Sequence, residues 1–142
     1  MSYDLVIFGG KICTAADTMF ADIGIKDGQI VAIGRHLDHS GAEVIDATDK
    51  LVLPGGIDSH VHLSQPSGEG IVMADNFETG TRSALCGGNT TIMPFCLQER
   101  NDNLREALNA YHGLAEDQCY TDVAFHLIIS NPDPQTLGQD LP

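Results

Sequence analysis

The chain has 142 residues with 20 acidic and 7 basic side chains, and its formal net charge of -13 argues against binding nucleic acid or an anionic membrane surface by charge. The length is too short for a complete (β/α)8 barrel, which needs at least ~200 residues. No stretch approaches the roughly 20 apolar residues of a membrane span, and no basic segment near Met1 suggests a secretory signal. The four cysteines form no C-x-x-C pair, so we expect reduced thiols in a cytoplasmic protein.

Residues 1–53 have the pattern of a small β-rich domain. Gly9-Gly10 is expected to turn the chain between its first two strands, and Asp27-Gly28 supplies a two-residue hairpin turn. Short strands at this spacing predict a small sandwich or a meander. The expected strands are residues 4–8, 11–14, 22–26, 29–33, 43–46 and 51–53.

From Pro54 the pattern alternates between strands and helices, beginning with an apolar run that extends from Leu51 to Asp58. A helix, a buried strand, a second helix and a strand apolar on both faces follow. This order predicts a parallel α/β arrangement with right-handed crossovers. The expected elements are a helix over 77–86 capped by Asp75 or Asn76, a strand over 89–95, a helix capped by Asp102 that runs to about 116, and a strand over 123–129.

Two histidines, His60 and His62, stand at the end of the first of these strands. Side chains at i and i+2 of a strand point to the same face, roughly 6.5–7 Å apart along the chain. Two imidazole nitrogens there can converge on one cation at about 2.0–2.1 Å each. Asp58 lies two residues before His60 and therefore on the same face of the strand. Its carboxylate can orient a metal-binding residue without itself binding the metal. The spacing therefore predicts a metal site at a strand end.

The segment Pro54-Gly-Gly-Ile-Asp-Ser-His-Val-His62 resembles the signature of the amidohydrolase superfamily. With Asp75-Asn-Phe77 and Gly87-Gly-Asn-Thr-Thr91 it is similar to the dihydropyrimidinase and D-hydantoinase family of cyclic amidases. The resemblance implies that residues 1–53 are the N-terminal part of a small β-sandwich-like composite domain. Residues 54–142 are then the first three β/α units of a TIM-type (β/α)8 barrel, both parts being incomplete.

The same resemblance implies a metal-dependent hydrolase that opens a dihydropyrimidine or hydantoin ring to an N-carbamoyl amino acid. In that family two divalent metals, usually zinc, share a carboxylated lysine, and His60 and His62 map to two of the metal ligands. No catalytic residue maps within the chain, and no lysine follows residue 53, so we expect an N-terminal fragment that is inactive alone. The expected partners are a small cyclic ureide or imide and further copies of the chain in a tetramer or dimer, without nucleic acid or membrane.

Two alternatives stay open, an allantoinase or other cyclic amidohydrolase, and a non-catalytic dihydropyrimidinase-related scaffold. Retention of both histidines weighs against the scaffold. Ser64 stands where dihydroorotases carry a substrate-binding arginine, which argues for a less acidic ring. The segment from Leu63 to Met73 is predicted to be a surface connection or a loop that shapes the substrate pocket. Of the other histidines, His126 is expected in the core or behind a ligand, and His36, His39 and His112 on the surface.

Overall fold

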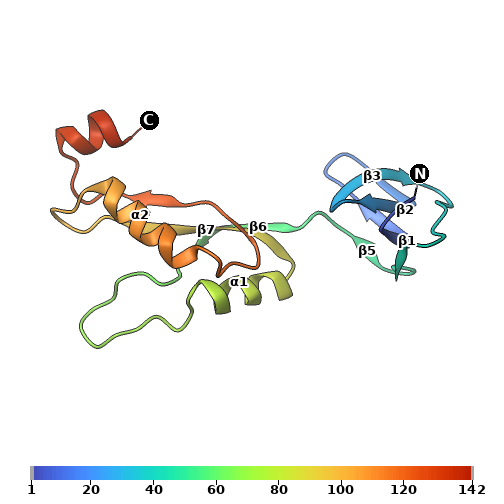
Figure 1. The fold of residues 1–142 in the computed structure, drawn as a ribbon, viewed down its shortest axis with the longest axis horizontal. Helices are drawn as coiled ribbons and strands as arrows, with labels where there is room; N and C mark the ends of the chain where they lie inside the picture. Colours follow the sequence, from blue (N-terminus) through green and yellow to red (C-terminus); the bar gives the residue numbers. More distant parts are fainter. Residues whose placement is uncertain (1, 142) are drawn as a thin grey trace. The chain divides into compact units, whose positions relative to one another are not determined.

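The computed structural model describes residues 2–141, which divide into two compact units, one that ends at Pro54 and one that begins at Gly55. Each unit is built around its own sheet (Figure 1). All four cysteines are free. In the described part of the chain, no helix combines the length and the apolar character needed to cross a membrane.

The first unit is one five-stranded sheet. Its strands β1, β2 and β3 form an antiparallel meander, and β4 and β5 both pair with β1 in parallel. Of the two predicted arrangements the meander is therefore the one observed. Ile12, Ala21 and Ile23 form the buried cluster of this sheet. The strands are β1 Leu5–Cys13, β2 Thr18–Lys26, β3 Gln29–Gly34, β4 Glu43–Asp46 and β5 Leu51–Val52.

The turn predicted at Gly9-Gly10 is wrong, because β1 runs straight through it as a single strand. The pairing of β1 with β2 skips between Ile7 and Gly10, and Gly9 has a φ of 72°, which marks a β-bulge. The backbone N–H of Gly9 donates to Oδ1 of Asp22 at 2.9 Å. One residue with positive φ kinks a strand without reversing it, and Asp22 satisfies the N–H that leaves the ladder.

The apolar run from Leu51 to Asp58 is also not one strand. It divides at Pro54, which has no N–H for a ladder, so that β5 ends in the first sheet and β6 Gly56–Val61 opens the second. The start of β6 lies close to the neighbouring strand. A Cβ added to Gly55 would lie 2.0 Å from Oγ1 of Thr90, so only glycine fits there.

The second unit alternates strands and helices, and its strands pair in parallel (Figure 1). The predicted helix over 77–86 is confirmed as α1 Phe77–Cys86, with Asn76 as its N-cap in a capping box with Thr79. Strand β7 Asn89–Leu97 lies at the centre of the sheet, between β6 on one side and β8 Asp122–Val123 and β9 His126–Ile128 on the other.

Three details differ from the sequence prediction in this unit. Helix α2 Leu104–Ala115 is capped by Asn103 instead of Asp102. The predicted strand over 123–129 is split into β8 and β9, because the ladder with β7 is interrupted at Ala124 and Phe125, although the N–H of Ala124 still donates to the carbonyl of Ile92. A π-helical turn, η1 Thr136–Asp140, was not predicted.

Gln98, directly after β7, is fully buried and joins the loops at this end of the sheet. Its Nε2 donates to the carbonyl of Asp102 and to the hydroxyl of Thr136, and its Oε1 accepts from the backbone N–H groups of Ser130 and Asn131. All four hydrogen-bonding positions of the amide are therefore occupied, as a buried amide requires.

The two faces of the second sheet have different environments. Alternate residues of β7, Ile92, Pro94 and Cys96, are buried. Ile92 and Cys96 form one core with Phe77 of α1 and Tyr111 of α2, and Leu63 completes this cluster. Because successive side chains of a strand alternate between faces, Phe95 points to the opposite face, away from this core.

Candidate metal site at the end of strand β6

His60 is the second-to-last residue of β6, and His62 is the first residue after the strand. Their ring centroids are 5.2 Å apart, so the two imidazoles lie on one face of the strand as the i, i+2 spacing predicts. Both residues are exposed, whereas Val61 between them is half-buried and packs against the core. The alternation of the strand thus separates one residue that packs in the core from two exposed imidazoles.

Phe95 of β7 is the centre around which three histidines gather. The ring of His62 stacks on it with centroids 5.1 Å apart and an interplanar angle of 16°, and the ring of His60 lies 4.5 Å away. His126 of β9 contacts Phe95 from the other neighbouring strand, at 4.8 Å. Parallel pairing of β6, β7 and β9 brings these side chains together on the sheet face opposite the helices.

Two of the three histidines have a ring nitrogen engaged. Nδ1 of His62 lies 2.8 Å from Oε1 of Gln65, and Nε2 of His126 donates to the carbonyl of Ser59 at 3.0 Å. The second contact joins β9 to β6 across the intervening strand, next to His60. The sequence predicted that His126 lies in the core or supports a metal ligand. In the structure it lies beside the histidine pair, in contact with Phe95 and Ser59.

Asp58 lies on the same strand, and its Oδ1 accepts a hydrogen bond from the backbone N–H of His60 at 3.1 Å. This contact fixes the carboxylate beside the main chain of the first histidine. Orientation of an imidazole ring by Asp58 stays a prediction.

The chain just after the pair is anchored to the core. Leu63 is buried, and its carbonyl accepts a hydrogen bond from the hydroxyl of Tyr111 at 2.6 Å. Burial, with the nearby thiol of Cys96 as a smaller cause, raises the pKa of Tyr111 to about 12. Helix α2 therefore positions the residue that follows His62 through one hydroxyl.

We expect ionisation of Tyr111 to unfold this region at high pH. Its pKa is raised from 10.0 to about 12, so the folded state holds the proton more tightly than the unfolded state. Stability is complete below about pH 10 and falls by up to about 2–3 kcal/mol as the pH rises towards 12. Urea unfolding followed by circular dichroism between about pH 9 and 12 measures this slope.

The control for this prediction is Tyr111→Phe, which removes the titrating group. At neutral pH this variant should lose roughly 1–3 kcal/mol, because the buried carbonyl of Leu63 loses its donor. Its unfolding free energy should then depend less on pH above about 10 than that of the wild type. An equal slope in both proteins would show that Tyr111 is not the group responsible.

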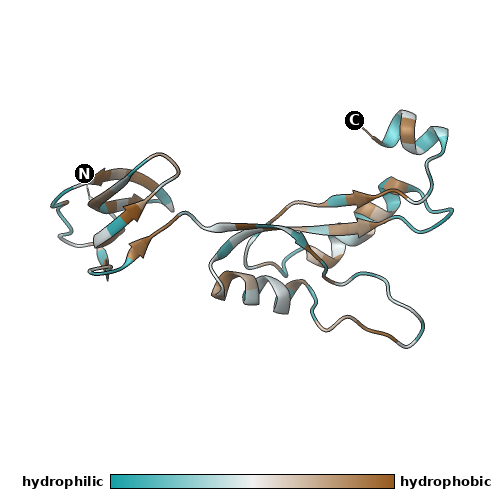
Figure 2. Ribbon diagram, turned by 180° about the vertical axis from the view of Figure 1, so that it is seen from behind, coloured by the Kyte–Doolittle hydropathy of each residue, from teal (hydrophilic) through white to brown (hydrophobic). Residues whose placement is uncertain are grey.

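The loop from Leu63 to Met73 is held at its base and open at its tip. The N–H of Ser64 donates to the carbonyl of Asp75, and the N–H of Gln65 points to the sulfur of Met73 at 3.2 Å. Figure 2 shows a hydrophobic stretch in this loop, where Ile71 is 66% and Val72 90% exposed. The structure therefore gives a surface loop with an apolar tip, whose base begins directly after His62.

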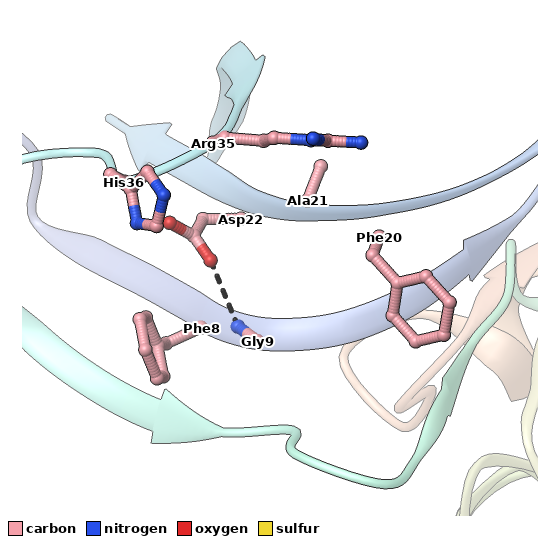
Figure 3. Close-up of a pocket in the computed structure, with 7 residues that line it drawn as sticks. All are labelled: Phe8, Gly9, Phe20, Ala21, Asp22, Arg35 and His36. Carbon is pink, nitrogen blue, oxygen red and sulfur yellow. Dashed lines mark hydrogen bonds between the residues drawn. The ribbon is translucent and has the colours of Figure 1, made fainter.

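A separate cavity of about 390 Å³ lies in the first unit (Figure 3). Asp22 there is 4% exposed, and its two carboxylate oxygens accept from the backbone N–H groups of Gly9 and Leu37. Because both carboxylate oxygens accept main-chain hydrogen bonds, Asp22 stabilises the bulge of β1. The lining residues are Phe8, Gly9, Phe20, Ala21, Asp22, Arg35 and His36.

Three other histidines named in the sequence analysis lie on the surface of their own units. His36 and His39 are exposed residues of the first unit, and His112 is exposed on α2, with its ring edge-on to Phe125 at 5.9 Å. Among residues 2–141, no three or more His, Cys, Asp or Glu side chains are grouped so that they could hold a metal ion. Metal binding by His60 and His62 stays a prediction.

Sequence reasoning missed two residues of this site, Phe95 and Gln65. Phe95 appeared as one apolar residue in a buried strand, and only parallel pairing shows that it faces both histidines. Gln65 lies three residues after His62 in an irregular loop, where no periodicity assigns a direction to a side chain. A glutamine close behind a predicted ligand was the available signal.

Comparison with known proteins finds named relatives that match nearly the whole chain. The chain is 48% identical over 137 residues to a D-hydantoinase of Geobacillus stearothermophilus and 35% identical over 147 residues to a dihydropyrimidinase of Rattus norvegicus. Each alignment includes 96% of this chain but only 29% and 28% of the relative. The chain therefore spans less than a third of the length of these relatives.

Solved structures give the same result. A D-hydantoinase from Bacillus sp. AR9 superposes with a TM-score of 0.88 at 47% identity, covering 94% of this chain and 29% of that one. An L-hydantoinase from Arthrobacter aurescens superposes with a TM-score of 0.69 at 27% identity. No protein family model matches the chain.

Proposed function

From the premise that the chain belongs to the D-hydantoinase and dihydropyrimidinase family, we propose that it forms the N-terminal portion of a metal-dependent cyclic amidohydrolase. The observation that carries the proposal is the placement of His60 and His62. They lie on one face at the carboxyl end of a parallel strand, with ring centroids 5.2 Å apart. This is the end of the strand at which α/β barrels place their chemistry.

The proposal includes the architecture of the whole enzyme. The first unit would be part of a composite β-sandwich-like domain, with the boundary at residue 53 or 54, and the second the first three β/α units of a TIM-type barrel. Parallel pairing of β6, β7 and β9, with α1 and α2 packed on one face of β7, supports the barrel. The sheet face that carries the histidines would face the barrel interior. The rest of the barrel would be formed by the residues that the relatives have outside the matched part.

The residues present fit a divalent metal, zinc being the first choice. Neutral imidazoles are common zinc ligands, and two imidazoles lie here with their ring centroids 5.2 Å apart. His60 and His62 would hold the ion from one strand, and Asp58 and Gln65 would support them. A bound metal supplies a Lewis acid and lowers the pKa of water towards neutrality. The family's second metal would depend on residues outside this chain.

The reaction proposed for the whole enzyme is hydrolysis of a ring amide. Water adds to the ring carbonyl, the C–N bond breaks, and the ring nitrogen takes up a proton to leave an N-carbamoyl amino acid. This chain contributes the His60–His62 ligand pair, which Phe95 supports from one side by ring contacts. The apolar loop tip at Ile71 and Val72 would shape the pocket for a small cyclic ureide or imide.

The proposal extends to a cytoplasmic homo-oligomer, a tetramer or dimer, that binds neither nucleic acid nor membrane. An allantoinase, or another cyclic amidohydrolase, is the second candidate, because Ser64 disfavours a ring with a free carboxylate and leaves the other uncharged rings open. Both candidates use the same histidine pair, so the substrate distinguishes them.

A chimera tests the function. This chain replaces the matching 29% of the Geobacillus stearothermophilus D-hydantoinase, to which it is 48% identical, and hydrolysis of hydantoin, dihydrouracil and allantoin is followed with zinc or manganese. We expect turnover of hydantoin or dihydrouracil by the chimera and none by the 142-residue chain alone. The intact relative is the positive control.

Each outcome of this experiment is informative. Turnover of allantoin in preference to the other rings would select the second candidate. A folded chimera that hydrolyses none of the three contradicts the proposed function. Robust turnover by the chain alone would show that the expected dependence on further residues is wrong.

A further inference from the structure

We propose that Gln65 is a positioning residue that fixes the tautomer of His62, with the proton on Nδ1, so that Nε2 presents its lone pair to a cation. The use of Nε2 rests on the function proposed above. The tautomer itself follows from the hydrogen bonds of the chain and is tested without a metal.

The argument begins with the amide of Gln65, which has one possible orientation. Its nitrogen Nε2 donates to the backbone carbonyl of Phe95 at 2.5 Å. A carbonyl oxygen only accepts, so the NH2 group has to face Phe95, and a flipped amide would place oxygen against oxygen. The amide oxygen Oε1 is thereby directed to the other side, where Nδ1 of His62 lies 2.8 Å away.

An amide oxygen also only accepts, so Nδ1 of His62 has to be the donor. A neutral imidazole carries a single N–H, and with that proton on Nδ1 the lone pair is on Nε2. Zinc-binding histidines typically donate their second ring N–H to a carboxylate, a carbonyl or water, which fixes both tautomer and ring direction. The Gln65 amide oxygen provides this acceptor for His62.

Both partners of this hydrogen bond are held in place by the same neighbours. The ring of His62 stacks on the ring of Phe95, and the amide of Gln65 is bonded to the carbonyl of Phe95. Leu63, between the two partners, is buried and bonded to Tyr111. The geometry therefore depends on the fold and not on a chance contact of two surface side chains.

His60 and His126 provide the comparison within the same site. In the described residues the ring of His60 has no hydrogen-bond partner, and its aromatic neighbours are His62 and Phe95. His126 has the opposite tautomer to His62, because its Nε2 donates to the carbonyl of Ser59. His126 is thus a reference in any measurement that distinguishes the two ring nitrogens.

The experiment is heteronuclear NMR of the imidazole groups in the metal-free chain, at a pH where histidines are neutral. In the wild type we expect His62 protonated on Nδ1 and His126 protonated on Nε2. Gln65→Leu should abolish the preference of His62 for Nδ1–H, and Gln65→Glu should keep it only in part, because a carboxylate still accepts from Nδ1 but loses the donor to the carbonyl of Phe95. An unchanged His126 in both variants shows that the site is still folded.

Zinc titration of the same three proteins provides the second readout. Loss of a partner of this kind typically weakens metal binding by roughly 10–100-fold, so we expect Gln65→Leu to fall in that range and Gln65→Glu to lie between Gln65→Leu and the wild type. His62 protonated on Nε2 in the wild type, or an unchanged tautomer in Gln65→Leu, would overturn the inference. If the tautomer follows Gln65 but zinc binding is the same in His62→Ala, the inference holds and the proposed metal role of His62 fails.

Discussion

Replacing Phe77 with alanine is expected to cost about 3–5 kcal/mol of unfolding free energy, the range for truncating a buried aromatic side chain. Phe77 is the first residue of α1 and is 1% exposed. Its ring lies 5.1 Å from that of Tyr111 and 6.2 Å from that of Phe125, so the cavity would separate α1 from α2 and from the segment before β9. The total unfolding free energy of a small domain is only about 5–15 kcal/mol, so much of the second unit should unfold.

Urea unfolding followed by far-ultraviolet circular dichroism measures this loss, since the chain has no tryptophan for fluorescence. Leu114→Ala is the control, because Leu114 is 52% exposed on α2 and alanine is a better helix former. We expect that variant to lose less than about 1 kcal/mol. Equal losses in the two variants would mean that Phe77 is not the centre of the core.

Replacing His60 or His62 with alanine in the chimeric enzyme is expected to lower turnover by at least about 100-fold. Loss of a residue that only supports a metal ligand already costs up to that factor in affinity or activity, and here the proposed ligand itself is removed. Both side chains are exposed and lie outside the core, so the fold should persist. Steady-state hydrolysis and metal content are measured on the same preparations.

His112→Ala is the matched control for this pair, because it removes an exposed histidine from α2. It should retain both turnover and metal. If His60→Ala and His62→Ala behave like His112→Ala in both measurements, the pair does not bind the metal. If metal is retained but turnover is lost, the two histidines act on the substrate instead.

Patterns of hydrophobic spacing predicted most of the elements of this chain. Helix α1 has the predicted bounds, and β7 begins at the predicted residue, because local signals determine them: a capping box at Asn76 and a glycine pair at 87–88. The errors occurred where tertiary contacts decide. Gly9-Gly10 has the composition of a turn, but Asp22, 13 residues away in sequence, captures the free N–H and keeps β1 continuous.

The two histidines could be predicted from the sequence because a strand places residues i and i+2 on one face whatever surrounds it. Their neighbours could not, because a pattern along one strand gives no information about which strand lies beside it. Phe95 meets His60 and His62 through the pairing of β6 with β7, and His126 joins them through the pairing of β9 with β7.

The sequence alone showed that 142 residues are too few for a complete barrel and predicted the histidine pair on one face at the end of β6, since residue number and strand periodicity are properties of the chain itself. The tertiary structure alone decided how that pair is held. The tautomer of His62 depends on an amide in an irregular loop, whose direction is determined by the carbonyl of Phe95, 30 residues further along the chain. Hydrogen bonds between such distant segments exist only once the sheet has formed.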